Sequence, residues 1–122
     1  MPSETAVKSF IVSTFRSVWA IDLLRVLLAT PDRALTTAGL IEQLRASESV
    51  VAQSVESLSA AGMVIADGDL VRLREFDPDT HGLLEAAIDL YRISPDKVRR
   101  LIVAQSLPGA TAFSDAFRLW KD

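Results

Sequence analysis

The chain has 122 residues and a net charge of −3, with 49% hydrophobic and 24% charged residues, which is the size and balance of one globular domain over residues 1–122. It contains no cysteine, which excludes disulfides, thiolate metal sites and cysteine nucleophiles and agrees with a reducing cytoplasm. The first residues lack the regions of a signal peptide, and the most apolar stretch, 18–29, is too short to span a bilayer. We therefore expect a soluble, cytoplasmic protein with no membrane partner.

Charge is distributed unevenly along the chain. Residues 48–89 carry nine acidic and two basic side chains, whereas residues 1–47 carry four acidic and five basic ones. Residues 90–122 carry three acidic and six basic ones. The small negative net charge gives no general attraction to nucleic acid, and the middle segment repels it.

The first predicted helix covers residues 5–29, because no glycine or proline interrupts apolar residues at helical spacing. Its apolar residues occupy two neighbouring sides: Val7, Phe10, Ile11, Val18 and Ile21 on one, and Phe15, Trp19, Leu23 and Val26 on the other. A helix that is apolar around so much of its circumference lies at the centre of a core or against a partner. Pro31 ends it, since the residue before a proline disfavours helix.

Two shorter helices follow, joined by a tight turn. The second covers residues 37–45 with Thr36 or Thr37 as N-cap, and the third covers residues 47–61 with its first serine as N-cap. Gly62 stands where helices commonly end in the left-handed conformation. The residues expected to face inward are Leu40, Ile41, Leu44, Val51, Val55 and Leu58.

The period then changes from helix to strand, and back to helix. Residues 63–66 and 69–73 are predicted strands, and Asp67-Gly68 between them is a strong signal for a two-residue hairpin turn. The C-terminal part, residues 80–120, is predicted to be helical. Its helices are expected over 80–91 with Asp79 or Thr80 as N-cap, over 94–106 with Ser94 as N-cap and Pro95 in first position, and around Phe113, Phe117 and Trp120.

This order of helices, glycine stop and hairpin is that of a winged helix-turn-helix, with a core over about residues 17–75. Its most typical stretches are Leu40–Ser47 and Val55–Val64, which resemble the small bacterial winged-helix regulators related to the MarR and ArsR families. The predicted fold class is therefore mainly α, a winged helix-turn-helix with one short β-hairpin and additional C-terminal helices. The resemblance implies a DNA-binding transcriptional regulator.

The flanks resemble a narrower group of proteins. Ser17–Leu24 and Phe113–Arg118, followed by Lys121-Asp122, are similar to a group of small proteobacterial winged-helix proteins. That resemblance covers most of the chain and implies a fold but no activity.

The third helix, 47–61, is the predicted recognition helix for double-stranded DNA. Gln53 can pair with adenine in the major groove, and Glu56 can accept a hydrogen bond from cytosine. The side chains assigned to phosphate oxygens are Ser47, Ser49, Ser57, Arg72 and Arg74.

The charge pattern opposes this assignment. The helix 47–61 contains no lysine or arginine, although neutralising phosphates supplies most non-specific affinity, and the hairpin turn carries Asp67 and Asp69. A solvated helix face accounts for Gln53 and Glu56 equally well. The alternative function is a non-catalytic winged-helix module that binds a protein partner and has little or no affinity for DNA.

A homodimer is the expected assembly, because two-fold dimers are the commonest oligomers and the family resemblance implies dimerisation through terminal helices. The residues assigned to this interface are Phe10, Phe15, Trp19, Leu84, Ile88 and Tyr91. Packing within one chain is the alternative explanation for them. The basic cluster at residues 92–100 is interpreted first as a solvated helix terminus, and second as a patch for phosphate or an acidic surface.

No pattern in the sequence indicates catalysis or a cofactor. His81 is the only histidine, which excludes a histidine pair and a Cys/His zinc site. No nucleophile elbow or glycine-rich phosphate loop is present. Asp77, Asp79 and Gly82 follow the start of a calcium loop, but Ile88 stands where the bidentate glutamate is needed. We expect a protein that is not an enzyme and that binds no metal or cofactor.

Overall fold

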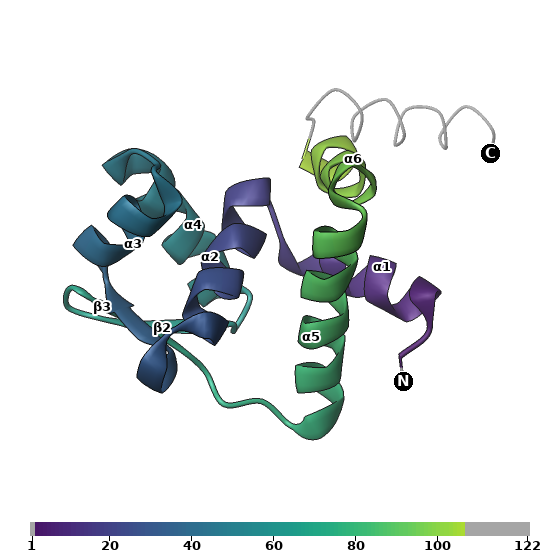
Figure 1. The fold of residues 1–122 in the computed structure, drawn as a ribbon, viewed down its shortest axis with the longest axis horizontal. Helices are drawn as coiled ribbons and strands as arrows, with labels where there is room; N and C mark the ends of the chain where they lie inside the picture. The colour runs from purple at the N-terminus through teal and green to yellow at the C-terminus, as the bar shows by residue number, and fades with distance from the viewer. Residues whose placement is uncertain (1, 107–122) are drawn as a thin grey trace, which may run out of the picture.

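The computed structural model describes residues 2–106, which form six α-helices and a small antiparallel sheet (Figure 1). In chain order the elements are α1 (Glu4–Thr14), α2 (Val18–Ala29), the 3-10 turn η1 (Pro31–Arg33), β1 (Ala34–Thr36), α3 (Thr37–Leu44), α4 (Glu48–Ala60), β2 (Val64–Asp67), β3 (Leu70–Leu73), α5 (Pro78–Ile93) and α6 (Pro95–Ser106). One group of elements consists of α2, α3, α4 and the sheet, and a second group consists of α1, α5 and α6. The mainly helical class predicted from the sequence is confirmed.

The predicted single helix over residues 5–29 is in fact two helices. Ser17 takes an extended conformation, and its Oγ accepts a hydrogen bond of 3.3 Å from the backbone N–H of Ala20, so it is the N-cap of α2. Phe15, just before it, is fully buried. The one-helix prediction is wrong because serine also occurs inside helices and marks a break less clearly than proline or glycine does.

The two short helices begin at capping residues named from the sequence. Oγ1 of Thr36 accepts from the N–H of Gly39 at 3.0 Å, and Oγ of Ser47 accepts from the N–H of Val50 at 3.1 Å. Both predicted caps are confirmed. Between the helices Arg45 adopts the left-handed conformation, with φ of 53°, which ends α3 and makes the turn into α4 tight.

A glycine with positive φ lies near each end of the segment between α4 and β3. Gly62 has φ of 78° and follows α4, as predicted. The hairpin turn is shifted by one residue from the prediction: Asp67 pairs with Leu70, so the central residues are Gly68 and Asp69. Gly68 has φ of 61°, and a type II′ turn requires positive φ at its first central residue.

The sheet has three strands, whereas the sequence predicted one hairpin only. β1 runs antiparallel to β3, with Ala34 opposite Arg72 and Thr36 opposite Leu70, so β3 is the middle strand. Three residues are too few to show a period of two, and β1 exists because β3 pairs with it rather than because of a local preference.

The helix α5 begins earlier than predicted. Its N-cap is Asp77, not Asp79 or Thr80, and Pro78 is its first helical residue, where a missing N–H costs nothing. A hydrogen bond from the Thr80 side chain lowers the pKa of the Asp77 carboxyl.

The helix α6 begins at Pro95 directly after Ser94, as predicted. It covers Pro95–Ser106 within the residues that the structure describes. The predicted last helix around Phe113, Phe117 and Trp120 lies outside the described residues.

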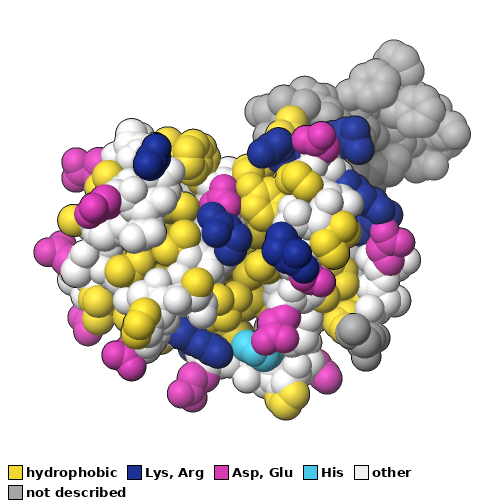
Figure 2. Space-filling model, in the orientation of Figure 1, with side chains coloured by type: hydrophobic (Ala, Val, Ile, Leu, Met, Phe, Trp, Pro, Cys, Tyr) yellow, Lys and Arg dark blue, Asp and Glu magenta, His cyan; other side chains and the backbone are white. Residues whose placement is uncertain are grey.

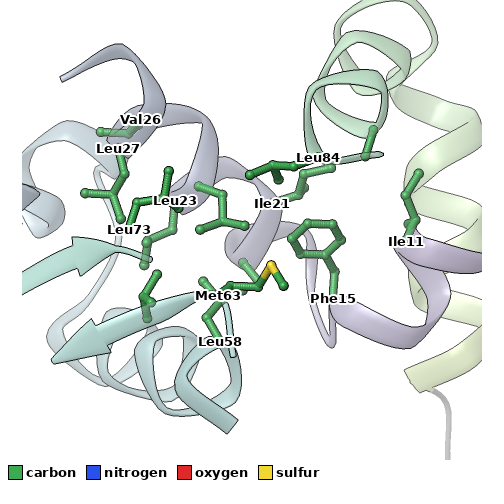
Figure 3. Packing of buried hydrophobic residues seen from close by; sticks show 14 of the residues in the cluster. Ile11, Phe15, Ile21, Leu23, Val26, Leu27, Leu58, Met63, Leu73 and Leu84 are labelled. Atoms are coloured by element: carbon green, nitrogen blue, oxygen red, sulfur yellow. The ribbon is translucent and has the colours of Figure 1, made fainter. Parts of the chain in front are cut away.

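One continuous cluster of buried side chains joins the two groups of elements (Figure 3). Phe15, Ile21 and Leu84 lie close together on the side of α1 and α5, while Leu73 lies on the side of the sheet. The ring of Phe15 meets that of Phe10 edge-to-face, with centroids 6.0 Å apart. The helix α2 supplies the largest share of fully buried residues: Ala20, Ile21, Leu23, Leu24 and Leu27.

Candidate nucleic-acid interface

The helix α4 presents one polar face to solvent and packs its other face into the core. On the inner side Val51 and Leu58 are fully buried. On the outer side Ser49, Gln53 and Glu56 are exposed. The three polar side chains therefore lie together on an accessible surface of a helix whose position is held by the core.

The serines of this region have different hydrogen bonds. Ser47 caps α4 through its Oγ, and the hydroxyl of Ser57, which is half-buried, donates to the backbone carbonyl of Ser54 at 3.2 Å. No hydrogen bond within the described part of the chain engages the exposed side chain of Ser49. Of the three serines assigned to phosphate, Ser49 is therefore the best placed to meet a ligand.

A shallow hollow of about 470 Å³ lies between α4 and the break that separates α1 from α2. Gln53, Glu56 and Ser57 line one side of it, and Arg16 lines the other. Within residues 2–106 no carboxylate lies within 4 Å of the Arg16 guanidinium, so no ion pair there holds it. Arg16 was missed from the sequence because it was placed inside a continuous helix.

The hairpin tip is tied to the start of α3. The N–H and the hydroxyl of Thr37 both donate to the backbone carbonyl of Asp69, at 2.7 and 3.2 Å. Asp67, Gly68 and Asp69 are all exposed. The tip is therefore held in place next to α3 while its two carboxylates face solvent.

The two arginines assigned to phosphate lie away from that tip. Arg72 is on the middle strand, opposite Ala34 and Ile65, and Arg74 follows the end of β3 that pairs with the start of β2. Together with Arg33 they line a separate hollow that the outer face of α4 does not share. The structure therefore does not bring the predicted phosphate-binding residues into one site.

Acidic and basic side chains are concentrated on different parts of the surface. Figure 2 shows acidic side chains around the margin where α3 and the hairpin lie, and more Lys and Arg side chains near α5 and α6. The helix α4 itself carries Glu48 and Glu56 and no basic residue. The outer face of α4 and the hairpin tip thus carry carboxylates, and the basic side chains next to α4 are Arg16 at its edge and Arg45 in the turn before it.

The six residues assigned to a dimer interface do not form one exposed patch. Phe15 and Leu84 are fully buried inside the chain, so a partner cannot touch them without a rearrangement of the core. Phe10, Ile88 and Tyr91 are partly buried and pack against that core. Only Trp19 among the six is exposed, at 39%.

Most basic residues of the 92–100 cluster are engaged within the chain. The ion pairs are Arg92 with Asp89 (2.6 Å), Lys97 with Glu4 (2.6 Å) and Arg99 with Asp96 (3.1 Å). The hydrogen bond from Lys97, with the charge of Lys8, lowers the pKa of the Glu4 carboxyl. These contacts favour the interpretation as a solvated helix terminus.

The remaining ionisable groups form no recognisable metal centre. His81 Nε2 lies 2.7 Å from Glu85 Oε1 on the same face of α5, an ion pair only when the histidine is protonated. In the range 2–106, no three His, Cys, Asp or Glu side chains are grouped as a metal ion requires. None of the helices in that range has the length and apolar character needed to cross a bilayer.

Comparison of the chain with protein-family models, with curated proteins and with solved structures finds no match.

Proposed function

We propose that the chain is a winged helix-turn-helix protein that binds double-stranded DNA as a transcriptional regulator, with α4 as its recognition helix. Three features of the fold support this proposal. The elements from α2 to β3 follow the order of that motif, the turn between α3 and α4 is short, and the hairpin is anchored beside α3.

The exposed face of α4 is the observation that carries the proposal. Ser49, Gln53 and Glu56 project from a helix whose N-terminus is capped by Ser47 and whose other side is fixed by the core. A rigid polar helix face of this kind fits the major groove, where an amide pairs with adenine and a carboxylate accepts from cytosine.

Phosphate contacts in this proposal come from the edge of α4 rather than from the hairpin tip. Arg16 borders the same hollow as Gln53, so its guanidinium can reach a phosphate flanking the bases that α4 reads. The exposed carboxylates of Asp67 and Asp69 repel phosphates from the tip. Arg72 and Arg74, which line another hollow, contribute at longer range.

Two substitutions test this arrangement. Gln53→Ala removes a base contact, so it should relax sequence preference at one position and cost about 1–3 kcal/mol of binding free energy. Arg16→Ala should weaken all duplexes alike and lower the salt slope by about one. Gln43→Ala, on the exposed side of α3, is the matched control. A Gln53→Ala protein with the wild-type sequence preference would contradict the assignment of α4.

A protein-docking module is the second candidate, and the acidic surface favours it. The helix α4 lacks lysine and arginine, and the hairpin tip carries two exposed aspartates. Such a surface is complementary to a basic protein partner. Under this candidate the chain shows no salt-sensitive retention of duplex DNA at low ionic strength, whereas the first candidate requires such retention.

The DNA-binding proposal includes a cytoplasmic homodimer. A two-fold dimer places two α4 helices on half-sites about one DNA turn, ~34 Å, apart. Sedimentation equilibrium at micromolar concentration tests the dimer. A monomer under those conditions would contradict the proposed homodimer.

A further inference from the structure

Three arginines from two distant segments of the chain line one hollow of about 770 Å³ beside the sheet. Arg33 comes from η1, whereas Arg72 lies on the middle strand β3 and Arg74 directly follows that strand. The backbone N–H of Arg74 still donates to the carbonyl of Met63, at 3.0 Å, so the extended pairing continues to this residue. Because side chains at i and i+2 lie on the same face of a strand, Arg72 and Arg74 share one face of the sheet.

The turn that brings Arg33 to this hollow has an unfavourable backbone conformation. Asp32 and Arg33 have φ of 60° and 53°, although neither residue is glycine. Left-handed conformations of this kind persist only where the surrounding structure holds them. Here the N–H of Arg33 donates to the carbonyl of Thr30 at 3.0 Å, and Ala34 pairs with Arg72 in the sheet. The backbone therefore holds Arg33 beside β3 from both sides of the turn.

The three guanidinium groups have no carboxylate partner in the described part of the chain. Within residues 2–106 no carboxylate lies within 4 Å of any of them, although Asp32 and Glu75 also line the hollow. Five other basic residues do pair with carboxylates: Lys8, Arg25, Arg92, Lys97 and Arg99. Arg72 and Arg74 are the only basic residues in the acidic segment 48–89, and both line this hollow. The lining therefore carries an excess of positive charge at one place on the sheet.

A phosphate group fits the chemistry of this hollow. Each guanidinium has a planar set of N–H donors that matches two phosphate oxygens, and an anion between like charges relieves their repulsion. The wall beside the arginines is apolar: Ile65, which lies opposite Arg72 in the sheet and is 37% exposed, lines the hollow together with Leu73. The volume of about 770 Å³ is that of a typical site for a small molecule. A ligand with a phosphate and an apolar group contacts both parts of this lining.

We propose that Arg33, Arg72 and Arg74 form a binding site for a small organic phosphate, a molecule with a phosphate group and an apolar group. This site is separate from the outer face of α4, because the hollow beside α4 and the hollow beside the sheet have no lining residue in common. Binding of the organic phosphate therefore does not depend on DNA binding by α4, and the two are tested separately.

Titration with phenyl phosphate, followed by NMR of the backbone amides at physiological ionic strength, tests the site. Wild type should show saturable shifts around Arg33 and Arg72, with a dissociation constant on the order of 1 mM or below. Arg33→Gln, Arg72→Gln and Arg74→Gln change exposed side chains, so each should keep the fold and raise the dissociation constant about tenfold. Arg100→Gln removes the same charge from an exposed position on α6 and is the matched control, with unchanged affinity. No saturable binding by wild type, or an equal loss in Arg100→Gln and Arg33→Gln, would overturn the proposal.

Inorganic phosphate and duplex DNA, used as further probes, identify the source of the phosphate group. Because the phenyl ring covers Ile65, phenyl phosphate should bind about fivefold more tightly than inorganic phosphate, and Ile65→Thr should abolish this difference. Equal affinity of wild type for the two probes would overturn the assignment to an organic ligand. If Arg33→Gln weakens duplex binding while phenyl phosphate leaves the amide shifts of wild type unchanged, the arginines bind the DNA backbone and the proposal is overturned.

Discussion

Tyr91 of α5 donates a hydrogen bond of 3.1 Å from its Oη to Oδ2 of Asp22 in α2, and so links the two groups of elements. The other carboxylate oxygen, Oδ1, accepts from Nε of Arg25 at 3.3 Å. Burial of the phenol, together with the negative charge of Asp22, raises the pKa of Tyr91. A polar contact therefore reinforces the junction that the buried side chains form.

Loss of this bond should destabilise the chain. Tyr91→Phe keeps the ring and removes the donor, so the free energy of unfolding in urea should fall by about 1 kcal/mol. Because the raised pKa favours the neutral phenol in the folded state, this contribution is complete below pH 10.0, the ordinary pKa, and is lost as the pH rises through the higher folded value. A Tyr91→Phe protein as stable as wild type at pH 7 would contradict this role of the hydrogen bond.

The break between α1 and α2 can be tested at Ser17. Ser17→Ala removes the N-cap of α2 and should cost about 1 kcal/mol in thermal or urea unfolding. In an uninterrupted helix over residues 5–29 the same change would be stabilising, since alanine is the best helix former. The sign of the effect therefore decides between the two arrangements. Ser9→Ala, exposed inside α1, is the control and should not destabilise.

Substitution by alanine should change the stability of the chain in opposite directions at Gly82 and Gly62. Gly82→Ala in α5 should raise the free energy of unfolding by about 0.5–1 kcal/mol, because the position is helical and a Cβ meets open space. Gly62→Ala also meets open space but requires φ of 78°, so it should lower stability by about 1 kcal/mol. Both are measured on dilute protein. If both substitutions changed the free energy of unfolding in the same direction, backbone conformation would not be what determines their effects.

The contact of Glu4 with Lys97 should make the free energy of unfolding depend on pH in the acid range. The pKa of Glu4 is lowered from its ordinary 4.5 by the Lys97 hydrogen bond first and the Lys8 charge second. Its contribution is therefore present above pH 4.5 and is lost as the pH falls through the lower folded value. Glu4→Gln should lose less stability than wild type over this window. Identical stability–pH profiles of Glu4→Gln and wild type would show that the contact of Glu4 with Lys97 does not stabilise the chain.

Local signals predicted the helices with clear caps and stops. Thr36 and Ser47 accept the expected hydrogen bonds, and Gly62 ends α4 with positive φ, because each of these features depends on neighbours within a few residues. β1 could not be predicted in this way, since a three-residue strand exists through its pairing with β3.

The site was predicted less completely than the fold. The exposed face of α4 follows from helical periodicity, so Ser49 and Gln53 lie where the pattern put them. Arg16 was missed because its place beside α4 depends on the chain break after α1. Phe15 and Leu84 were assigned to the dimer interface, but they are buried in the core of the chain. The sequence shows only that a side chain is apolar, and does not show whether its own core or a partner covers it.

Binding of the wild-type chain to duplex DNA at graded salt concentrations tests the central claim most directly. If α4 is a recognition helix, fluorescently labelled genomic fragments should be bound at low ionic strength. Affinity should then fall linearly in log–log form with salt, with a shallow slope because the basic residues beside α4 in the described range are few, Arg16 at its edge and Arg45 in the turn before it. Absence of salt-sensitive binding at low ionic strength would contradict the DNA-binding account and favour the protein-docking module.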